Sequence, residues 1–198
     1  MPDRRDPESV EPPRLGPRYA VLGPLGAGSG GAVWRVADRL RDETVAVKLL
    51  PPGDGTREFE LLARLQHPGT VRVLDNGYAA NGQPWFSMDL CSGTPLGVAV
   101  APCPPGRVAE LLARLLEAVG FVHDRGWVHG DLKPDNVLAD PETPRITLLD
   151  FGLAMAANGA TELRGTPGFI APEVLDGTSG VSTRSDLYSV GVMGHAAL

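Results

Sequence analysis

The sequence has few cysteines, no long apolar run and no block of positive charge, and each absence excludes a class of protein. Its two cysteines, Cys91 and Cys103, are too few for a disulfide framework and lack the paired spacing of a zinc site. No stretch approaches the roughly 18 uninterrupted apolar residues of a membrane span. The net charge of −6 argues against a nucleic-acid-binding surface. We therefore expect a cytoplasmic protein without a membrane segment and without nucleic-acid partners.

The chain is nevertheless apolar enough to build a core. Hydrophobic residues make up 42% of its 198 positions, which is ordinary for a globular protein. Residues 1–18 are rich in proline and charge and lack the apolar segment of a signal peptide, so we predict a disordered lead-in there. A connector rich in glycine and proline, residues 91–106, separates a strand-like part from a helix-like part.

The spacing of apolar residues predicts strands first and a long helix later. From Val108 to Val122, apolar residues recur at helical spacing and lie on one face of the predicted long helix. The Asn81-Gly82 pair is typical of a tight hairpin. The leucines of residues 57–65 predict a shorter helix. Short apolar or alternating runs predict strands over residues 19–25, 32–36, 44–50, 71–74 and 84–90.

A glycine-rich loop follows the first predicted strand. Gly26, Gly28, Gly31 and Val33 fit the pattern G-x-G-x-x-G-x-V, in which glycines let the backbone approach phosphate oxygens closely. A dinucleotide-binding loop would require a helix directly after it, whereas a strand-like run follows here. The pattern favours a flap over phosphates, and a plain hairpin tip is the alternative.

A single lysine stands in the next apolar run, Val45-Ala46-Val47-Lys48. A lysine in such a strand either reaches solvent at an edge or pairs with negative charge. Glu58 and Glu60 on the following predicted helix are both candidate partners. Lys48 lies one hairpin from the glycine loop, which suits a contact with phosphates.

Three motifs follow the long predicted helix in a fixed order. They are His129-Gly130-Asp131-Leu132-Lys133-Pro134-Asp135-Asn136, Asp150-Phe151-Gly152 and the segment from Gly165 to Glu173. Together with the glycine loop and Lys48, they resemble the motifs of protein kinases, specifically the eukaryotic-like Ser/Thr kinases of bacteria. The resemblance runs from about Tyr19 almost to the last residue.

The resemblance implies an α+β, bilobal fold. We expect an N-lobe of antiparallel β-sheet with one helix over residues 19–88, a hinge over 89–92 and a mainly helical, incomplete C-lobe over 93–198. It also implies phosphoryl transfer from Mg-ATP to serine or threonine hydroxyls of a protein substrate, with Mn²⁺ as an alternative metal. The sequence does not indicate the protein substrate or the oligomeric state.

The same resemblance assigns the catalytic and metal-binding residues. Asp131 would orient the substrate hydroxyl, and Lys133 would offset charge on the γ-phosphate. Asn136 and Asp150 would hold the metal ion. Lys48 would bind the α- and β-phosphates and be oriented by Glu58, which the family's register selects over Glu60.

The nucleotide base is assigned in the same way. Met88 would be the gatekeeper, and the backbone of Asp89 to Cys91 would hydrogen-bond the adenine. Thr166 would lie against Asp131. Asp186 would hold in place the segment from His129 to Asn136, which carries Asp131. The other nucleotide-binding residues would be Leu25, Gly26, Gly28, Gly31, Val33, Ala46, Lys48 and Leu138.

The sequence departs from the family at Gly130 and at its end. Many members have arginine at the position of Gly130, where it receives an activation-loop phosphate. We therefore expect activity not to depend on phosphorylation of Thr161. Because the chain stops soon after Asp186, we also expect part of the apolar face of the Val108–Val122 helix to be uncovered.

Two other functions stay open. The chain could be an inactive, pseudokinase-like fragment that binds the nucleotide without transferring phosphate. A small-molecule phosphotransferase shares the lysine and aspartate layout, although the Thr166–Glu173 segment favours a protein substrate.

Overall fold

The computed structural model describes residues 11–28, 30–51, 56–101, 103–156 and 165–197, which fall into two compact units. The first unit comprises Met1–Arg64 and Arg72–Leu90. The second comprises Leu65–Val71 and Cys91–Leu198. In the part of the chain that the structure describes, no helix is long and apolar enough to span a bilayer.

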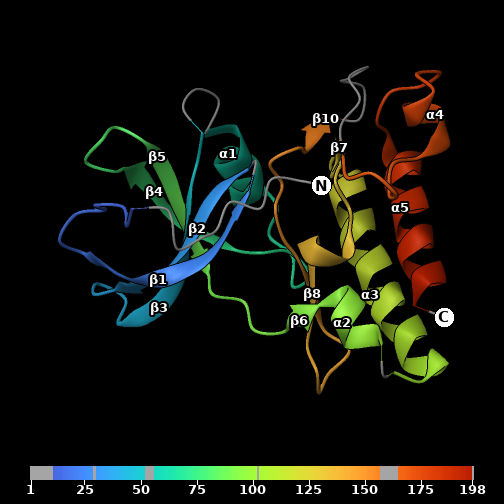
Figure 1. The fold of residues 1–198 in the computed structure, drawn as a ribbon, viewed down its shortest axis with the longest axis horizontal. Helices are drawn as coiled ribbons and strands as arrows, with labels where there is room; N and C mark the ends of the chain where they lie inside the picture. The colour runs from blue at the N-terminus through green and yellow to red at the C-terminus, as the bar shows by residue number, and fades with distance from the viewer. Residues whose placement is uncertain (1–10, 29, 52–55, 102, 157–164, 198) are drawn as a thin grey trace. The chain divides into compact units, whose positions relative to one another are not determined.

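In its described residues, the first unit is an antiparallel sheet with one helix, α1 (Thr56–Arg64) (Figure 1). Its strand order is β1-β2-β3-β5-β4, and each neighbouring pair is antiparallel. Gly82, with φ of +80°, provides the turn between the last two strands, as the Asn81-Gly82 pair predicts. The strands are β1 (Tyr19–Gly28), β2 (Gly31–Asp38), β3 (Glu43–Leu49), β4 (Val73–Tyr78) and β5 (Pro84–Asp89).

Strand β4 lies further along the chain than the predicted strand over 71–74. Thr70 forms a bridge with Leu148, and the Val71 N–H donates to the Leu148 carbonyl at 3.0 Å. Residues 70–71 therefore pair within the second unit. This pairing partner is remote in sequence, so the local pattern did not reveal it.

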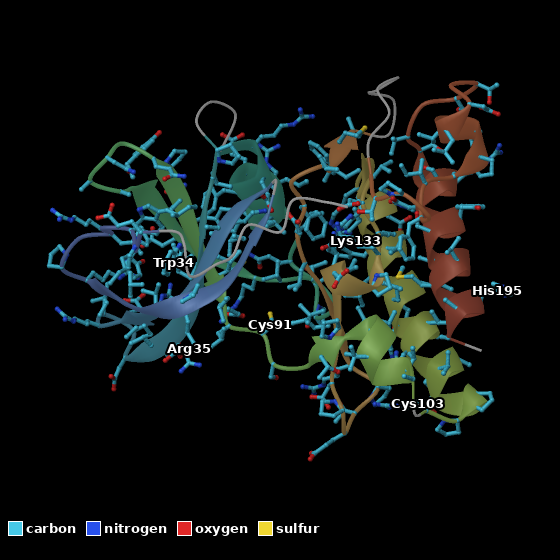
Figure 2. All side chains as sticks on the ribbon, in the orientation of Figure 1. Trp34, Arg35, Cys91, Cys103, Lys133 and His195 are labelled. Carbon is cyan, nitrogen blue, oxygen red and sulfur yellow. The ribbon has the colours of Figure 1, made fainter. Side chains whose placement is uncertain are left out.

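One face of this sheet carries an aromatic core. Trp34 is buried, whereas Arg35, the next residue of β2, is exposed, as alternation along a strand requires (Figure 2). Tyr19 meets Trp85 edge-on, with ring centroids 5.0 Å apart. Leu15 belongs to the same buried cluster.

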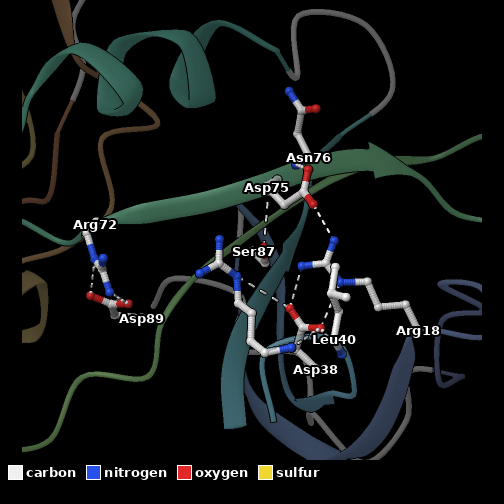
Figure 3. Close-up of polar contacts among 9 residues, drawn as sticks. Arg18, Asp38, Leu40, Arg72, Asp75, Asn76, Ser87 and Asp89 are labelled. Atoms are coloured by element: carbon white, nitrogen blue, oxygen red, sulfur yellow. Dashed lines mark hydrogen bonds and ion pairs between the residues drawn. The ribbon is translucent and has the colours of Figure 1, made fainter. Parts of the chain in front are cut away.

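Arg18 attaches the segment before β1 to the sheet (Figure 3). Its guanidinium donates to both carboxylate oxygens of Asp38, at 2.7 and 2.6 Å, and to Asp75 at 2.6 Å. Together with buried Leu15, these bonds show that Leu15 and Arg18 of the predicted lead-in pack against the sheet, while residues 1–10 lie outside the described residues.

Where the structure describes it, the second unit is built mainly from helices, with two small sheets. The helices are α2 (Leu96–Val100), α3 (Pro105–His123), α4 (Pro172–Leu175) and α5 (Thr183–Ala196). Strands β6 (Thr94–Pro95), β8 (Val137–Ala139) and β9 (Ile146–Leu148) form one sheet, and β7 (Trp127–Val128) pairs with β10 (Met155–Ala156). A single turn of 3₁₀ helix covers Pro134–Asn136.

The connector over 91–106 contains regular structure that the sequence pattern did not predict. Thr94 and Pro95 pair with Ala139 and Leu138, and the short helix α2 follows directly. Strand partners some 40 residues away hold this segment, and its own composition favours only turns.

The expectation that part of the apolar face of the long helix would be uncovered is wrong for all of its residues except Leu112, which is only partly buried. Helix α5 lies beside α3 (Figure 1), and Gly194 approaches the Leu112 side chain so closely that a Cβ there would be 3.0 Å from it. The buried residues of this face are Val108, Leu111, Leu115, Val119 and Val122.

Candidate active site

Lys48 and Glu58 form a buried ion pair in the first unit. Lys48 Nζ lies 2.8 Å from each oxygen of the Glu58 carboxylate, and the two residues are only 4% and 8% exposed. Glu58 stands in the first turn of α1, where the helix dipole favours a negative charge. Glu60 is exposed. Of the two glutamates that spacing left open, the structure therefore brings Glu58 to the lysine.

The glycine loop joins β1 to β2, between two strands as the sequence predicts. Gly28 pairs with Gly31 at the tip, and Ser29 lies outside the described residues. Gly31 has φ of +115°, and a Cβ there would overlap the Leu49 carbonyl. Gly26 has open space where a Cβ would stand. Gly31 is therefore required by the fold, whereas Gly26 is not.

The strand register gathers several predicted nucleotide-binding residues on one face of the sheet. Val33 stands opposite Lys48, and Ala46 stands opposite Met88. Cross-strand partners share a face, and residues two apart on a strand share it too. This face is the reverse of the one that carries Trp34. Leu25 on β1 is 47% exposed, and Leu138 belongs to β8 of the second unit.

Asp131, Lys133 and Thr166 form a closed triangle of hydrogen bonds in the second unit. Thr166 Oγ1 donates to Asp131 Oδ1 at 2.7 Å, and Lys133 Nζ donates to Asp131 Oδ2 at 2.7 Å. Lys133 Nζ also donates to Thr166 Oγ1 at 2.8 Å. Both carboxylate oxygens of Asp131 are thus held in place, and an ionised carboxylate can only accept hydrogen bonds. The contact between Thr166 and Asp131 agrees with the expectation from the sequence.

Asn136 and Asp150 come from neighbouring segments. The Leu149 N–H donates to the Asn136 carbonyl at 2.9 Å, which brings the residue before Asp150 beside Asn136. Asn136 Nδ2 donates to the Asp131 carbonyl at 2.8 Å, so its side-chain oxygen is left for another partner. Amide and carboxylate oxygens are the hard donors that Mg²⁺ prefers.

These two residues fit a metal ion that takes its other ligands from elsewhere. Among the residues described, no group of three or more His, Cys, Asp or Glu could hold a metal by itself. Mg²⁺ commonly binds one or two protein oxygens and completes its shell with phosphate oxygens and water. The donor set therefore suits a metal that arrives with a phosphate ligand.

Asp186 holds the backbone that leads into Asp131. Its buried carboxylate accepts hydrogen bonds from the N–H groups of His129, at 2.8 Å, and Gly130, at 3.0 Å. Ser182 and Ser185 cap the first turn of α5 reciprocally, which fixes the turn that presents Asp186. The structure thus gives the anchoring contact expected for Asp186.

His123 is a contributor that sequence reasoning missed. Its Nε2 lies 2.8 Å from Asp186 Oδ2, so the last turn of α3 joins the same network. The only local signal was the position of His123 six residues before His129. Its partner lies 63 residues away, and nothing in the motif pattern indicates that contact.

Gly130 has a conformation that suits glycine. Its φ is +78°, and a Cβ there would lie 3.0 Å from the Leu153 carbonyl. An arginine at this position would therefore require a different local backbone. Thr161, whose phosphorylation we expect to be dispensable, lies outside the described residues.

Comparison with known proteins places the chain among kinases. The family model described as "Protein kinase domain" matches residues 19–198. The DNA damage-responsive serine/threonine-protein kinase RqkA of Deinococcus radiodurans is 39% identical over 90% of this chain and 29% of its own length. The serine/threonine-protein kinase pkn2 of Myxococcus xanthus is 35% identical, with coverages of 91% and 24%.

A third relative gives the same picture. The serine/threonine-protein kinase PknB of Mycobacterium leprae is 33% identical over 91% of this chain and 32% of its own length. The chain therefore spans between about a quarter and a third of the length of these relatives.

Proposed function

The chain belongs to the protein kinase family, and on this premise we propose that it transfers the γ-phosphoryl group of ATP to serine or threonine hydroxyls of a protein substrate. The triangle of Asp131, Lys133 and Thr166 is the observation that carries this proposal. It holds a hydrogen-bond-accepting carboxylate next to a lysine ammonium, as a transfer from phosphate to hydroxyl requires.

Each residue of the triangle has a role in this proposal. Asp131 orients the attacking hydroxyl and accepts its proton. Lys133 offsets the negative charge of the transferred phosphoryl group. Thr166 keeps both side chains in register through its hydroxyl.

The proposed nucleotide contacts follow the sequence assignment. Lys48, fixed by Glu58, binds the α- and β-phosphates, and the glycine loop covers them with backbone N–H groups. Asp89 to Cys91 bind the adenine through their backbone. Leu25, Val33, Ala46 and Leu138 contact its ring, and Met88 is the gatekeeper residue.

The metal belongs to the proposal as well. Asn136 and Asp150 would hold a divalent ion, which we assign as Mg²⁺ because both side chains offer oxygen donors, with Mn²⁺ as the alternative. When bound, the metal neutralises charge on the phosphates. The lobe boundaries near residues 88 and 93 and a cytoplasmic location also stay proposals.

The segment from Thr166 to Glu173 supports a protein substrate over a small molecule. Thr166 places the start of this segment against Asp131. A phosphotransferase for small molecules has no need of such a segment, whereas a protein substrate needs a surface on which to dock beside the catalytic carboxylate.

The test is a transfer assay with the full chain, Mg-ATP labelled at the γ-phosphate and casein as the acceptor. We expect phosphoserine or phosphothreonine, and its loss in Asp131→Asn and Lys48→Met. Glu58→Gln should also lose transfer, whereas Glu60→Gln on the same helix should retain it.

Three outcomes would contradict the proposal. Transfer that persists in Asp131→Asn would show that Asp131 is not the catalytic carboxylate. Transfer to aminoglycosides or choline but not to protein would assign a small-molecule phosphotransferase. ATP binding without any transfer would assign an inactive nucleotide-binding protein.

A further inference from the structure

Arg72 and Asp89 make three hydrogen bonds to one another in the first unit (Figure 3). Arg72 Nε donates to Asp89 Oδ2 at 2.9 Å, and Arg72 Nη2 donates to Asp89 Oδ1 at 2.9 Å. This two-pronged geometry fixes the relative orientation of both side chains. The Asp89 N–H adds a third bond, to the Arg72 carbonyl at 3.0 Å. One residue therefore holds both the side chain and the backbone of Asp89.

Both residues border places where the chain passes between the two units. Arg72 is the first residue of the first unit after the Leu65–Val71 segment. Asp89 ends β5 and comes one residue before Leu90, where the first unit ends. The three bonds thus join two passages of the chain at the beginning of residues 89–91. Pairing of Asp89 with Val45 of β3 and the bond to the Arg72 carbonyl do not depend on the Arg72 side chain, so the two guanidinium bonds are what a substitution of Arg72 removes.

The exposure of this pair argues against a role in stability. The Arg72 and Asp89 side chains are 62% and 38% exposed, and ion pairs this exposed add little to the free energy of folding. The pair instead fixes the orientation of the Asp89 carboxylate, because the planar guanidinium binds a carboxylate through two hydrogen bonds in one orientation. Arg114 and Glu117 on α3 form an ion pair of similar exposure, 54% and 58%, and provide a matched control.

We propose that Arg72 is a positioning residue for recognition of the nucleotide base. By holding Asp89, it fixes the backbone of residues 89–91, which then accepts a hydrogen bond from the amino group of adenine. This inference rests on the proposed function, which assigns that backbone to the adenine. A backbone carbonyl selects for the amino group only while its peptide keeps one orientation.

The test compares two ligands that differ only in that amino group. Dissociation constants are measured by calorimetry for Mg-ATP and for the Mg complex of purine riboside triphosphate, which lacks the 6-amino group. The ratio of the two constants cancels the phosphate contribution, so a general attraction between Arg72 and the triphosphate would not change it. The proteins are the full wild-type chain, Arg72→Ala, Arg72→Lys and Arg114→Ala.

We expect wild type to prefer ATP and Arg72→Ala to lose roughly threefold to tenfold of that preference, the range of one hydrogen bond. Arg72→Lys keeps the charge but loses the fork, so its preference should be intermediate. Arg114→Ala should match wild type. In a transfer assay, Arg72→Ala should raise KM for ATP and leave kcat within about twofold. This is the result expected when the lost interaction is equally strong in the bound substrate and in the transition state.

The outcomes separate this inference from the proposed function. If Arg72→Ala weakens the binding of ATP and of purine riboside triphosphate equally, the inference about Arg72 is overturned. It is also overturned if the wild type binds the two triphosphates with equal affinity. If Arg72→Ala does not fold, a wild-type ratio in Arg72→Lys would overturn it. A wild type that binds neither ligand would instead overturn the proposed function.

Discussion

Asp38 shows how a single buried charge ties the start of the chain to the sheet. Its side chain has no exposed surface, and its carboxylate accepts two hydrogen bonds from Arg18 and one from the Leu40 N–H. These hydrogen bonds, chiefly those from Arg18, hold the pKa of Asp38 below its ordinary value. The ionised form is therefore favoured in the folded chain, and its contribution to stability is present above the ordinary pKa and lost as the pH falls through the lowered one.

We predict that Arg18→Met changes this pH dependence. Without the Arg18 guanidinium, the buried carboxylate keeps only the longer contact with Arg41, at 3.7 Å, and the loss should be about 3 kcal/mol of unfolding free energy at pH 7. The pKa of Asp38 should rise, so protonation should relieve part of the loss as the pH falls. Urea unfolding between pH 7 and pH 3 measures this. Arg39→Met, which removes an exposed guanidinium bonded to the Pro17 carbonyl, is the control. A constant difference from wild type across this pH range would contradict the prediction.

Two glycines of one loop should respond differently to a methyl group. Gly31→Ala places a Cβ at positive φ and against the Leu49 carbonyl, so it should lower the unfolding free energy by at least about 2 kcal/mol. Gly26→Ala has open space and should stay within about 0.5 kcal/mol of wild type. Thermal unfolding of both variants measures this. Equal melting temperatures would show that the loop backbone is not fixed as described.

At the scale of elements, helix α5 depends on its first turn. Ser182 accepts a hydrogen bond from the Ser185 N–H, and its own N–H donates to Ser185 Oγ at 2.8 Å. Ser182→Ala should therefore cost about 1 kcal/mol of stability. Ser179→Ala in the preceding exposed loop should cost little, and both can be compared by denaturant unfolding. A Ser182→Ala variant as stable as Ser179→Ala would contradict the capping role.

The sequence predicted those elements and contacts that repeat a pattern or belong to a motif. The strands β1, β2, β3 and β5 and the helix α3 follow apolar periodicity, and the resemblance identified Glu58 and Thr166. The sequence missed contacts whose partners are remote and carry no motif. Strand β6 pairs with β8, and His123 meets Asp186, only because the folded chain brings them together. Tertiary context decides such positions, and a local pattern does not contain it.

At the scale of the whole molecule, both units contain proposed nucleotide ligands. Lys48 belongs to the first and Asp150 to the second. We predict that Mg-ATP at about 100 times its Kd raises the free energy of unfolding by about 2.7 kcal/mol and slows hydrogen exchange in both units. Asp131→Asn should keep this stabilisation while losing transfer. Protection confined to one unit would contradict the assignment of ligands in both.

The Leu65–Val71 segment gives the chain a particular order of assembly during synthesis. The first unit has all its strands once residue 90 has left the ribosome, because β5 ends at Asp89. Leu65–Val71 belongs to the second unit, and the Val71 N–H pairs with the Leu148 carbonyl. Leu65 and Val71 are buried in the folded chain, but in the nascent chain they must stay exposed until almost 60 more residues emerge. At ordinary elongation rates this takes about 3–12 s. During that interval the Leu65–Val71 segment offers a chaperone an apolar surface that the finished fold buries.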